Sequence, residues 1–394
     1  MELSSRIKKV SPSETIAVTT RARQMKADGI DVVSFGAGEP DFDTPAYIKE
    51  ACKKALDEGD TKYTPRAGAK LKAAIAEKLR KENGLEYKPE QVLVTFGGKH
   101  ALFNAFQVLL EKADKVLIPS PYWVSYPEQV KLADGEFVAI PTGPEKGYKI
   151  TPDDVLEHAK GAKILVMNSP CNPTSVTYSP DELKAIAQAV LKTDLIVFSD
   201  EIYEKLIYGD TKFVSFAALD SRLMERTITF NGVAKCFSMP GWRIGWAAGP
   251  LNVIKAMANL ASHQTTDPVS FCQAATLAAY TDPQGPATIE AMRKEFEKRA
   301  QHMWKRLNAI KGLKCVQPTG AFYAFPDVSA HCGRTLGKIK VNGSLDFTAA
   351  CLEEAKVALV PGRAFGDDRC VRLSFATSME QIDKGLDRLE KLLT

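Results

Sequence analysis

The sequence lacks long hydrophobic runs, blocks of like charge and paired cysteines. No apolar run approaches bilayer length, so we expect no membrane-spanning segment. The 52 lysines and arginines nearly balance the 48 aspartates and glutamates, which gives binding to nucleic acid little support. The eight cysteines are scattered and form no C-x-x-C pair, as is typical of free thiols in a reducing compartment. With no apolar leader in residues 1–10, we predict a cytoplasmic protein. We also expect that the protein holds no metal.

Two common phosphate-binding motifs are also missing. Gly36-Ala37-Gly38 is followed by Glu39-Pro40 rather than by the rest of a G-x-G-x-x-G motif, and no G-x-x-x-x-G-K-[ST] occurs. Dinucleotide and P-loop classes therefore lose support. There is no internal repeat or long linker, yet 394 residues exceed what one hydrophobic core usually holds. We expect two domains.

The middle of the chain alternates short β-branched runs with amphipathic stretches. This pattern favours an α/β fold with a mostly parallel sheet that is covered on both faces. One helix is well marked, since Ser179 suits an N-cap, Pro180 the first helical position and Glu182 a capping box. The predicted strands are 92–95, 115–118, 136–140, 163–167, 195–199, 226–230 and 244–248.

The character of the sequence changes after about residue 285. A long charged helix over 288–310 is followed by short predicted strands and by a final helix over 379–392. We predict a large domain over 46–288 and a smaller α+β domain built from 1–45 plus 289–394. The short strands are expected near 314–316, 321–325, 357–360 and 370–374.

Reactive and polar residues follow four of the predicted strands. In open α/β sheets ligands bind beyond the carboxyl ends of the strands, so these residues are expected to share one site. Each has an ordinary alternative, because Gly97-Gly98 could be a plain turn, Asp200 a helix cap and Lys235 a surface lysine. Together they suit an anionic, planar and reactive ligand. Lys235 draws particular interest, since a desolvated lysine near another cation such as Arg243 forms Schiff bases with carbonyl compounds.

Nine motifs, in order and nearly end to end, resemble the class I/II pyridoxal-phosphate aminotransferases. The resemblance implies the pyridoxal-phosphate-dependent transferase fold type I. PYWVSYPE with GGKHALFN is most similar to the bacterial-type aspartate aminotransferases, which include aspartate/prephenate enzymes. The motifs are GAGEPDFDTP (36–45), TKYTP (61–65), PYWVSYPE (121–128), NSPCNPTS (168–175), SDEIYE (199–204), NGVAK (231–235), GWRIGWAAGP (241–250), GAFYAF (320–325) and VRLSFATS (371–378).

The resemblance implies pyridoxal 5'-phosphate as cofactor and assigns roles around its ring. Lys235 would hold the cofactor as a Schiff base and then act as the base, and Asp200 would pair with the pyridine nitrogen. Tyr203 and Asn172 would hydrogen-bond the 3-oxygen. Trp123 would stack on the ring, with an ordinary core aromatic as the alternative.

The resemblance also implies a homodimer with shared sites. Arg243 and the backbone N–H groups of Gly98 and Lys99 would hold the phosphate, together with Tyr63 from a second subunit. Arg372 would clamp the substrate α-carboxylate, a bidentate geometry that lysine cannot reproduce.

Substrate choice is implied by a further set of positions. Gly38, Trp123 and Asn172 would approach the substrate, and the Lys99 side chain would meet a distal carboxylate, with a solvent-facing lysine as the alternative. Thr15 matches a position associated with prephenate acceptance. Ser11, where many prephenate-using relatives have a cation, and His100, which replaces a usual glutamine, depart from that pattern.

We therefore expect an enzyme that transfers an amino group between L-aspartate or L-glutamate and 2-oxoglutarate or oxaloacetate by a ping-pong cycle. Its partners would be small amino and 2-oxo acids. Alternatives within the fold are aromatic or alanine specificity and a lyase that breaks another bond. A non-catalytic protein and an enzyme that uses Cys171 or Cys236 are alternatives from other classes.

Overall fold

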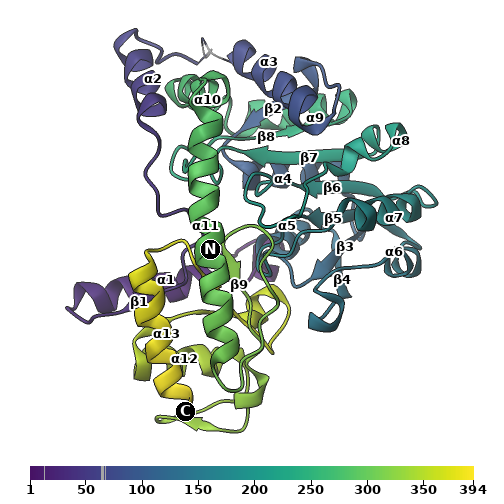
Figure 1. Ribbon diagram of the computed structural model, residues 1–394. Coiled ribbons are helices and arrows are strands. Elements are labelled where there is room, and N and C mark those ends of the chain that lie inside the picture. Colours follow the sequence, from purple (N-terminus) through teal and green to yellow (C-terminus); the bar gives the residue numbers. More distant parts are fainter. Residues whose placement is uncertain (13, 64–65, 67) are drawn as a thin grey trace.

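A seven-stranded sheet forms the centre of the larger part of the molecule (Figure 1). The computed structural model describes residues 1–12, 14–63, 66 and 68–394, and of residues 14–16 the backbone only. Neighbouring strands pair in parallel except β8, which is antiparallel to both β2 and β7. All seven predicted strands are confirmed. In spatial order they are β2 (Val92–Thr95), β8 (Gly245–Ala248), β7 (Thr227–Gly232), β6 (Ile196–Asp200), β5 (Ala162–Asn168), β3 (Lys115–Ser120) and β4 (Glu136–Pro141).

Helices cover both faces of this sheet, because its strands are apolar on both sides. On β3, Val116 and Ile118 pack into one hydrophobic cluster while Leu117, between them, packs into another. One face carries α4 (Gly98–Leu109), α5 (Ser125–Leu132) and α9 (Leu251–Gln264). The other carries α2 (Ala46–Asp57), α3 (Gly68–Lys78), α6 (Pro152–His158), α7 (Pro180–Val190), α8 (Ser221–Met224) and α10 (Ser270–Thr281).

The capping box expected at Ser179 is present at the start of α7. The Ser179 hydroxyl accepts a hydrogen bond from the N–H of Glu182, and the Glu182 carboxylate accepts one from the N–H of Ser179. Helix α3 continues as a π-helical turn, Leu79–Asn83, which Gly84 ends at φ 68°. Short 3-10 helices occupy Ile7–Lys9, Pro89–Gln91, Pro144–Lys146, Phe216–Ala218, Ser329–His331 and Gly362–Phe365.

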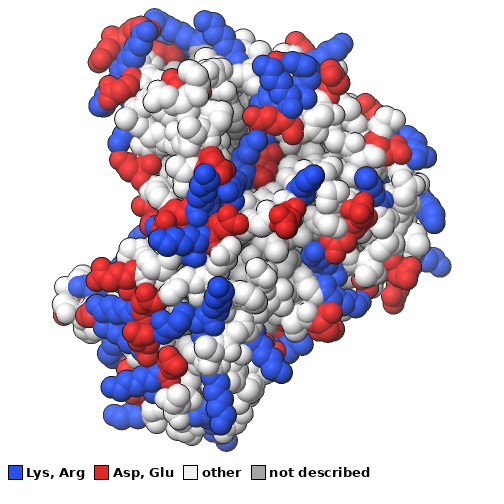
Figure 2. Space-filling model, in the orientation of Figure 1, with Lys and Arg blue, Asp and Glu red and all other residues white. Residues whose placement is uncertain are grey.

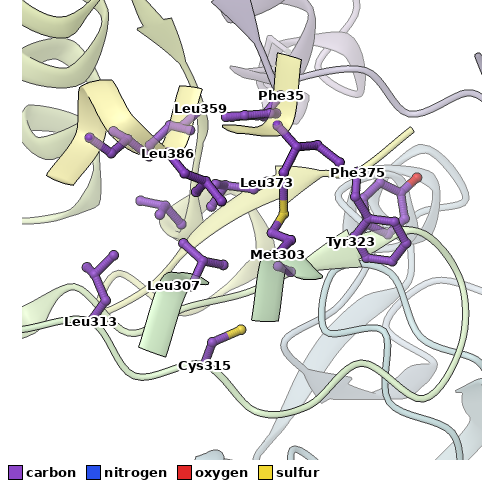
Figure 3. Close-up of a cluster of buried hydrophobic side chains, with 14 of the residues drawn as sticks. Phe35, Met303, Leu307, Leu313, Cys315, Tyr323, Leu359, Leu373, Phe375 and Leu386 are labelled. Atoms are coloured by element: carbon purple, nitrogen blue, oxygen red, sulfur yellow. The ribbon is translucent and has the colours of Figure 1, made fainter. Parts of the chain in front are cut away.

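The two ends of the chain build a second hydrophobic core. Helix α11 (Gly285–Ala309) runs from the region of α10 into this part, where α13 (Met379–Leu393) packs against it (Figure 1). Figure 3 shows the core, with Met303 and Leu307 of α11 beside Phe35, Leu373 and Leu386. The remaining elements are α1 (Glu14–Ala27), β1 (Val33–Ser34), β9 (Tyr323–Ala324), α12 (Ser344–Ala355), β12 (Val357–Ala358), β13 (Val360–Pro361) and β14 (Val371–Ser374).

Strand pairing links these ends directly. β1 pairs in parallel with β12, and β14 lies between β13 and β9 in an antiparallel sheet. The N-terminal segment therefore contacts the C-terminal part. The domain boundaries at 45/46 and 288/289 stay a prediction.

One predicted strand is wrong, one is divided, and one hairpin was not predicted. The strand predicted over 357–360 is two strands, β12 and β13, which belong to different sheets. The segment 314–316 forms only an isolated bridge between Lys314 and Asp327. The backbone of Cys315 instead bonds to side chains of α11, since its N–H donates to Asn308 and its carbonyl accepts from Trp304. The hairpin of β10 (Thr335–Leu336) and β11 (Ile339–Lys340) has strands too short for a sequence pattern.

Charges of both signs are mixed over the face seen in Figure 2, in keeping with the near balance of the composition. Among the described residues, no helix is long and apolar enough to cross a bilayer.

Candidate active site

A cavity of about 540 Å³ lies at the carboxyl ends of the central strands. Asn168, Asp200 and Asn231 reach it from the ends of β5, β6 and β7. The opposite wall comes from the second core, through Gly36 and Arg372. The site therefore sits where strand ends meet the smaller part of the molecule, as the sheet topology predicts.

One end of the cavity is a cup at the start of α4. Gly97 adopts φ 86°, and a Cβ there would lie 2.7 Å from Nη2 of Arg243. A Cβ on Gly245 would lie 2.3 Å from the backbone nitrogen of Gly98. These glycines let the guanidinium and the helix start approach each other. The first N–H groups of a helix lack partners within it, so the cup suits a phosphate.

Lys235 projects into the cavity from the loop after β7. Its amine donates a hydrogen bond to the carbonyl of Gly38. Burial lowers the pKa of this amine to about 8; the nearby Glu39 carboxylate opposes the shift, and the cations Arg372 and Arg243 add to it. The lowered pKa increases the fraction of neutral amine near physiological pH, and the neutral amine is the form that nucleophilic and base chemistry both require.

Asp200 faces the same cavity as the last residue of β6. Its side chain accepts hydrogen bonds from the Tyr126 hydroxyl at 2.6 Å and from the N–H of Ile202 at 3.3 Å. Burial raises the pKa of the carboxyl to about 6, and the Tyr126 hydrogen bond opposes the shift. No helix begins at Asp200, because 202–205 form turns, so the helix-cap alternative does not hold.

Tyr203 and Tyr323 join the two parts of the molecule across the cavity wall. Their hydroxyl oxygens lie 2.9 Å apart. Burial raises the pKa of Tyr203 well above its usual range, so this hydroxyl keeps its proton and can donate. Tyr323 also supports Arg372, whose guanidinium lies 4.4 Å from the centre of its ring.

Arg372 is a buried cation with no carboxylate partner in the described part of the chain. Only 3% of the residue is exposed. Its Nη1 donates to Oδ1 of Asn172 at 3.0 Å and its Nη2 to the carbonyl of Gly36 at 3.1 Å, while Nε has no partner among the described residues. A buried charge costs free energy unless it is paired. Its place in the cavity wall therefore points to an anionic ligand.

Lys99 adds a further cation from the first turn of α4. Its amine lies 4.9 Å from the centre of the Trp123 ring. Burial, with a contribution from Arg243, lowers the pKa of the amine. Lys99 is exposed on the single chain although it lines the cavity, so its contact with a substrate carboxylate stays a prediction beside the solvent-facing alternative.

Ten of the twelve predicted site residues line this one cavity. Tyr63 does not, since it is 88% exposed on the single chain, and the side chain of Thr15 lies outside the described residues. The chemical roles of all twelve stay predictions. The ten are Gly38, Gly98, Lys99, Trp123, Asn172, Asp200, Tyr203, Lys235, Arg243 and Arg372.

Several lining residues were not predicted. Tyr126 and Asn168 lie inside motifs quoted above, but a buried tyrosine in a helix resembles ordinary core. Tyr323 belongs to GAFYAF, a motif that was recognised without a role for its aromatic residues. Glu39 lies next to Gly38 and could have been found by the same reasoning. Arg23 carries no sequence signal of this kind.

The departures from the family pattern have local structural accounts. Ser175 stands in place of a usual glycine and adopts φ 57°, a left-handed conformation that glycine reaches without strain. Its hydroxyl accepts the N–H of Tyr323 at 2.9 Å, a contact that glycine could not make. Ser11 and His100 do not line the cavity. The N–H of Ser11 donates a hydrogen bond to Glu128, and the His100 ring accepts one from the N–H of Phe96.

Comparison with protein families matches residues 30–389 to Aminotransferase class I and II. The chain belongs to this family. This class I and II aminotransferase has the fold that the resemblance implied, and its reaction class is the transfer of an amino group. The resemblance noted in the sequence is confirmed.

Individual relatives in this aminotransferase family extend over the full length. The chain is 47% identical over 396 residues to an aspartate aminotransferase of Bacillus subtilis (strain 168), covering 100% of this chain and 99% of the relative. It is 44% identical over 393 residues to the aspartate/prephenate aminotransferase of Cereibacter sphaeroides (strain ATCC 17029 / ATH 2.4.9), covering 98% of each. A solved aspartate aminotransferase from Thermus thermophilus with maleate superposes with a TM-score of 0.93 at 43% identity and covers 100% of both chains.

Proposed function

We propose that this aminotransferase uses pyridoxal 5'-phosphate to move the amino group between L-aspartate or L-glutamate and 2-oxoglutarate or oxaloacetate. The observation that carries the proposal is one cavity that joins the Lys235 amine, the buried Asp200 carboxylate and the Arg372 guanidinium, which has no carboxylate partner among the described residues. Relatives named aspartate aminotransferase at up to 47% identity support the substrate class.

The residues present fit the cofactor. The cup at Gly97 and Gly98 with Arg243 suits its phosphate, because the absence of a Cβ on Gly97 lets the Arg243 guanidinium lie against the start of α4. Asp200 would hold a proton at the ring nitrogen, and Tyr203 and Asn172 would bond the 3-oxygen. When bound, the cofactor supplies a carbonyl that accepts the amino group and a ring that accepts electron density from the substrate Cα.

The remaining steps belong to side chains of this chain. Arg372 orients the substrate by its α-carboxylate, fixed in turn by Asn172 and Gly36. Lys235, neutral above a pKa of about 8, takes the proton from Cα and returns it on the other side of the transfer. The hydrogen bonds from Tyr126 and Ile202 to Asp200 stabilise its charged form against burial.

The test is a half-reaction without a second substrate. The cofactor-loaded protein is mixed with aspartate, its absorbance spectrum is followed, and the products are assayed. We expect one equivalent of oxaloacetate and no ammonia, with the original spectrum restored by 2-oxoglutarate. Release of alanine with carbon dioxide, or of fumarate with ammonia, would identify a lyase instead. Lys235→Ala should lower turnover by at least about a thousandfold and leave the phosphate cup able to bind cofactor.

Specificity is settled by a panel of amino donors that includes aromatic amino acids and alanine, with prephenate among the acceptors. The panel matters because the related structures include an aromatic aminotransferase from Pyrococcus horikoshii OT3, with a TM-score of 0.86 and 41% identity over 94% of this chain and 98% of the other. Preference for an aromatic donor over aspartate would overturn the proposed substrate class.

A further inference from the structure

Helix α1 (Glu14–Ala27) forms part of the cavity wall with one of its faces. Val18, Ala22 and Met25 pack into a small hydrophobic cluster with Val32 and Leu352. The neighbouring face carries Thr19, Thr20 and Arg23, which share one side of a helix because they are spaced i, i+1 and i+4. The hydrophobic contact of the first set therefore orients the second toward the cavity.

Arg23 differs from the other arginine on this helix in its partners. Arg21 lies 3.5 Å from Glu353 in an exposed ion pair. Arg23 also has an exposed side chain but makes no ion pair or hydrogen bond with any described residue. It lines the cavity as an uncompensated positive charge.

The face that carries Arg23 lies at the Arg372 end of the cavity. Oγ1 of Thr19, one helical turn before Arg23, lies 3.5 Å from where a Cβ on Gly36 would be. The carbonyl of Gly36 accepts a hydrogen bond from Arg372. Arg23, on the same helix face as Thr19, therefore lines the cavity on the side formed by the N-terminal segment.

We propose that Arg23 is a specificity-determining residue that meets the distal carboxylate of a dicarboxylic substrate, together with Lys99. The inference deepens the proposed function and rests on it. Three of the five cations that line the cavity already have a role in the proposed reaction, namely Arg243, Lys235 and Arg372. The other two, Arg23 and Lys99, are free to bind a second carboxylate. A substrate with two carboxylates needs a second cationic contact, whereas alanine does not.

The experiment compares Arg23→Gln, Arg23→Lys and the matched control Arg21→Gln, which changes the same residue type on the same helix. Calorimetry on the cofactor-loaded protein measures Kd for succinate and for propionate, neither of which can react. The aspartate and alanine half-reactions give kcat/KM for the same variants. We expect Arg23→Gln to weaken succinate and lower kcat/KM for aspartate by about tenfold, the size of a lost charged hydrogen bond.

Propionate and alanine should change less than about twofold, Arg23→Lys should fall between, and Arg21→Gln should match the unmodified chain. Equal effects on succinate and propionate, or none on either, would overturn the role of Arg23. The proposed function can fail separately: if the unmodified protein transfers no amino group from aspartate, the reaction proposal is wrong, while the succinate measurements still decide the role of Arg23.

Discussion

The pKa values of Lys235 and Asp200 are both shifted toward neutral pH, that of Lys235 downward and that of Asp200 upward. Burial lowers the pKa of Lys235 to about 8 and raises that of Asp200 to about 6, from ordinary values of 10.5 and 3.8. The charged form of each is disfavoured by removal from water. A lysine with a lowered pKa is more often neutral, which suits the role of base proposed for Lys235.

Two substitutions should shift the pKa of Lys235 in opposite directions. The neutral amine, present above the pKa, is the form that captures an aldehyde, so covalent capture of pyridoxal phosphate by the cofactor-free protein should rise with pH through about 8. Glu39→Gln should move the midpoint down, because the Glu39 carboxylate raises this pKa, and Arg372→Gln should move it up. Absorbance measured from pH 6 to 11 gives the midpoint.

Lys235→Ala is the control for this experiment and should show no covalent capture. A midpoint near 10.5 that neither substitution moves would contradict the effect of burial on the amine.

Residue types decided which parts of the site could be predicted from sequence. A lysine in a small-residue loop and an arginine within VRLSFATS are conspicuous, so Lys235 and Arg372 were found. Tyr126 and Tyr323 were not assigned, since a buried tyrosine ring looks like core until its hydroxyl partner is known.

At the scale of elements, the start of α4 depends on a residue without a side chain. Gly97→Ala would put a Cβ 2.7 Å from Nη2 of Arg243 and place it at φ 86°. We expect the free energy of unfolding to fall by about 1–2 kcal/mol and the Kd for pyridoxal phosphate to rise about tenfold, because Arg243 must move. Denaturant titration and fluorescence titration with the cofactor measure the two quantities.

Gly241→Ala is the matched control in the loop before Arg243. A Cβ there meets nothing within 4 Å, and the residue has no left-handed φ. It should change stability by less than about 0.5 kcal/mol. If both variants bound the cofactor like the unmodified chain, the close approach at Gly97 would have no bearing on the phosphate cup.

Element prediction succeeded where a local pattern decides the structure. The strands of the large sheet are short apolar runs that are largely buried except in the edge strand β4, and all seven were found within one or two residues. The strands near the chain ends are two to four residues long and pair with distant partners, as β1 does with β12. Such pairing depends on tertiary contacts that no local window contains, so 314–316 was predicted wrongly and the β10–β11 hairpin was missed.

At the scale of the whole molecule, Tyr63 bears on the predicted homodimer. It is 88% exposed on one chain although tyrosine is usually at least partly buried. A hybrid dimer tests whether it serves a partner's site. One subunit carries Lys235→Ala and the other Tyr63→Ala, with different affinity tags for purification.

In such a hybrid one site loses Lys235 and receives no intact Tyr63, while the other keeps its own Lys235 and takes Tyr63 from the partner. Activity should therefore return to about half of the unmodified dimer, above both parent homodimers. A hybrid no more active than half of the Tyr63→Ala dimer would show that Tyr63 acts within its own chain, and a monomer by light scattering would refute the dimer itself.

The hydrogen bond from Arg372 to Gly36 joins residues that are 336 positions apart. Arg372 also lies on β14, the middle strand of the sheet that holds β13 and β9. Closing so long a loop is a late event in folding, since its entropy must be overcome before the contact is gained. A chain interrupted before residue 372 therefore has neither the carboxylate contact nor the strand that supports it. A growing chain can therefore form the substrate-carboxylate contact only after residue 372 has been synthesised.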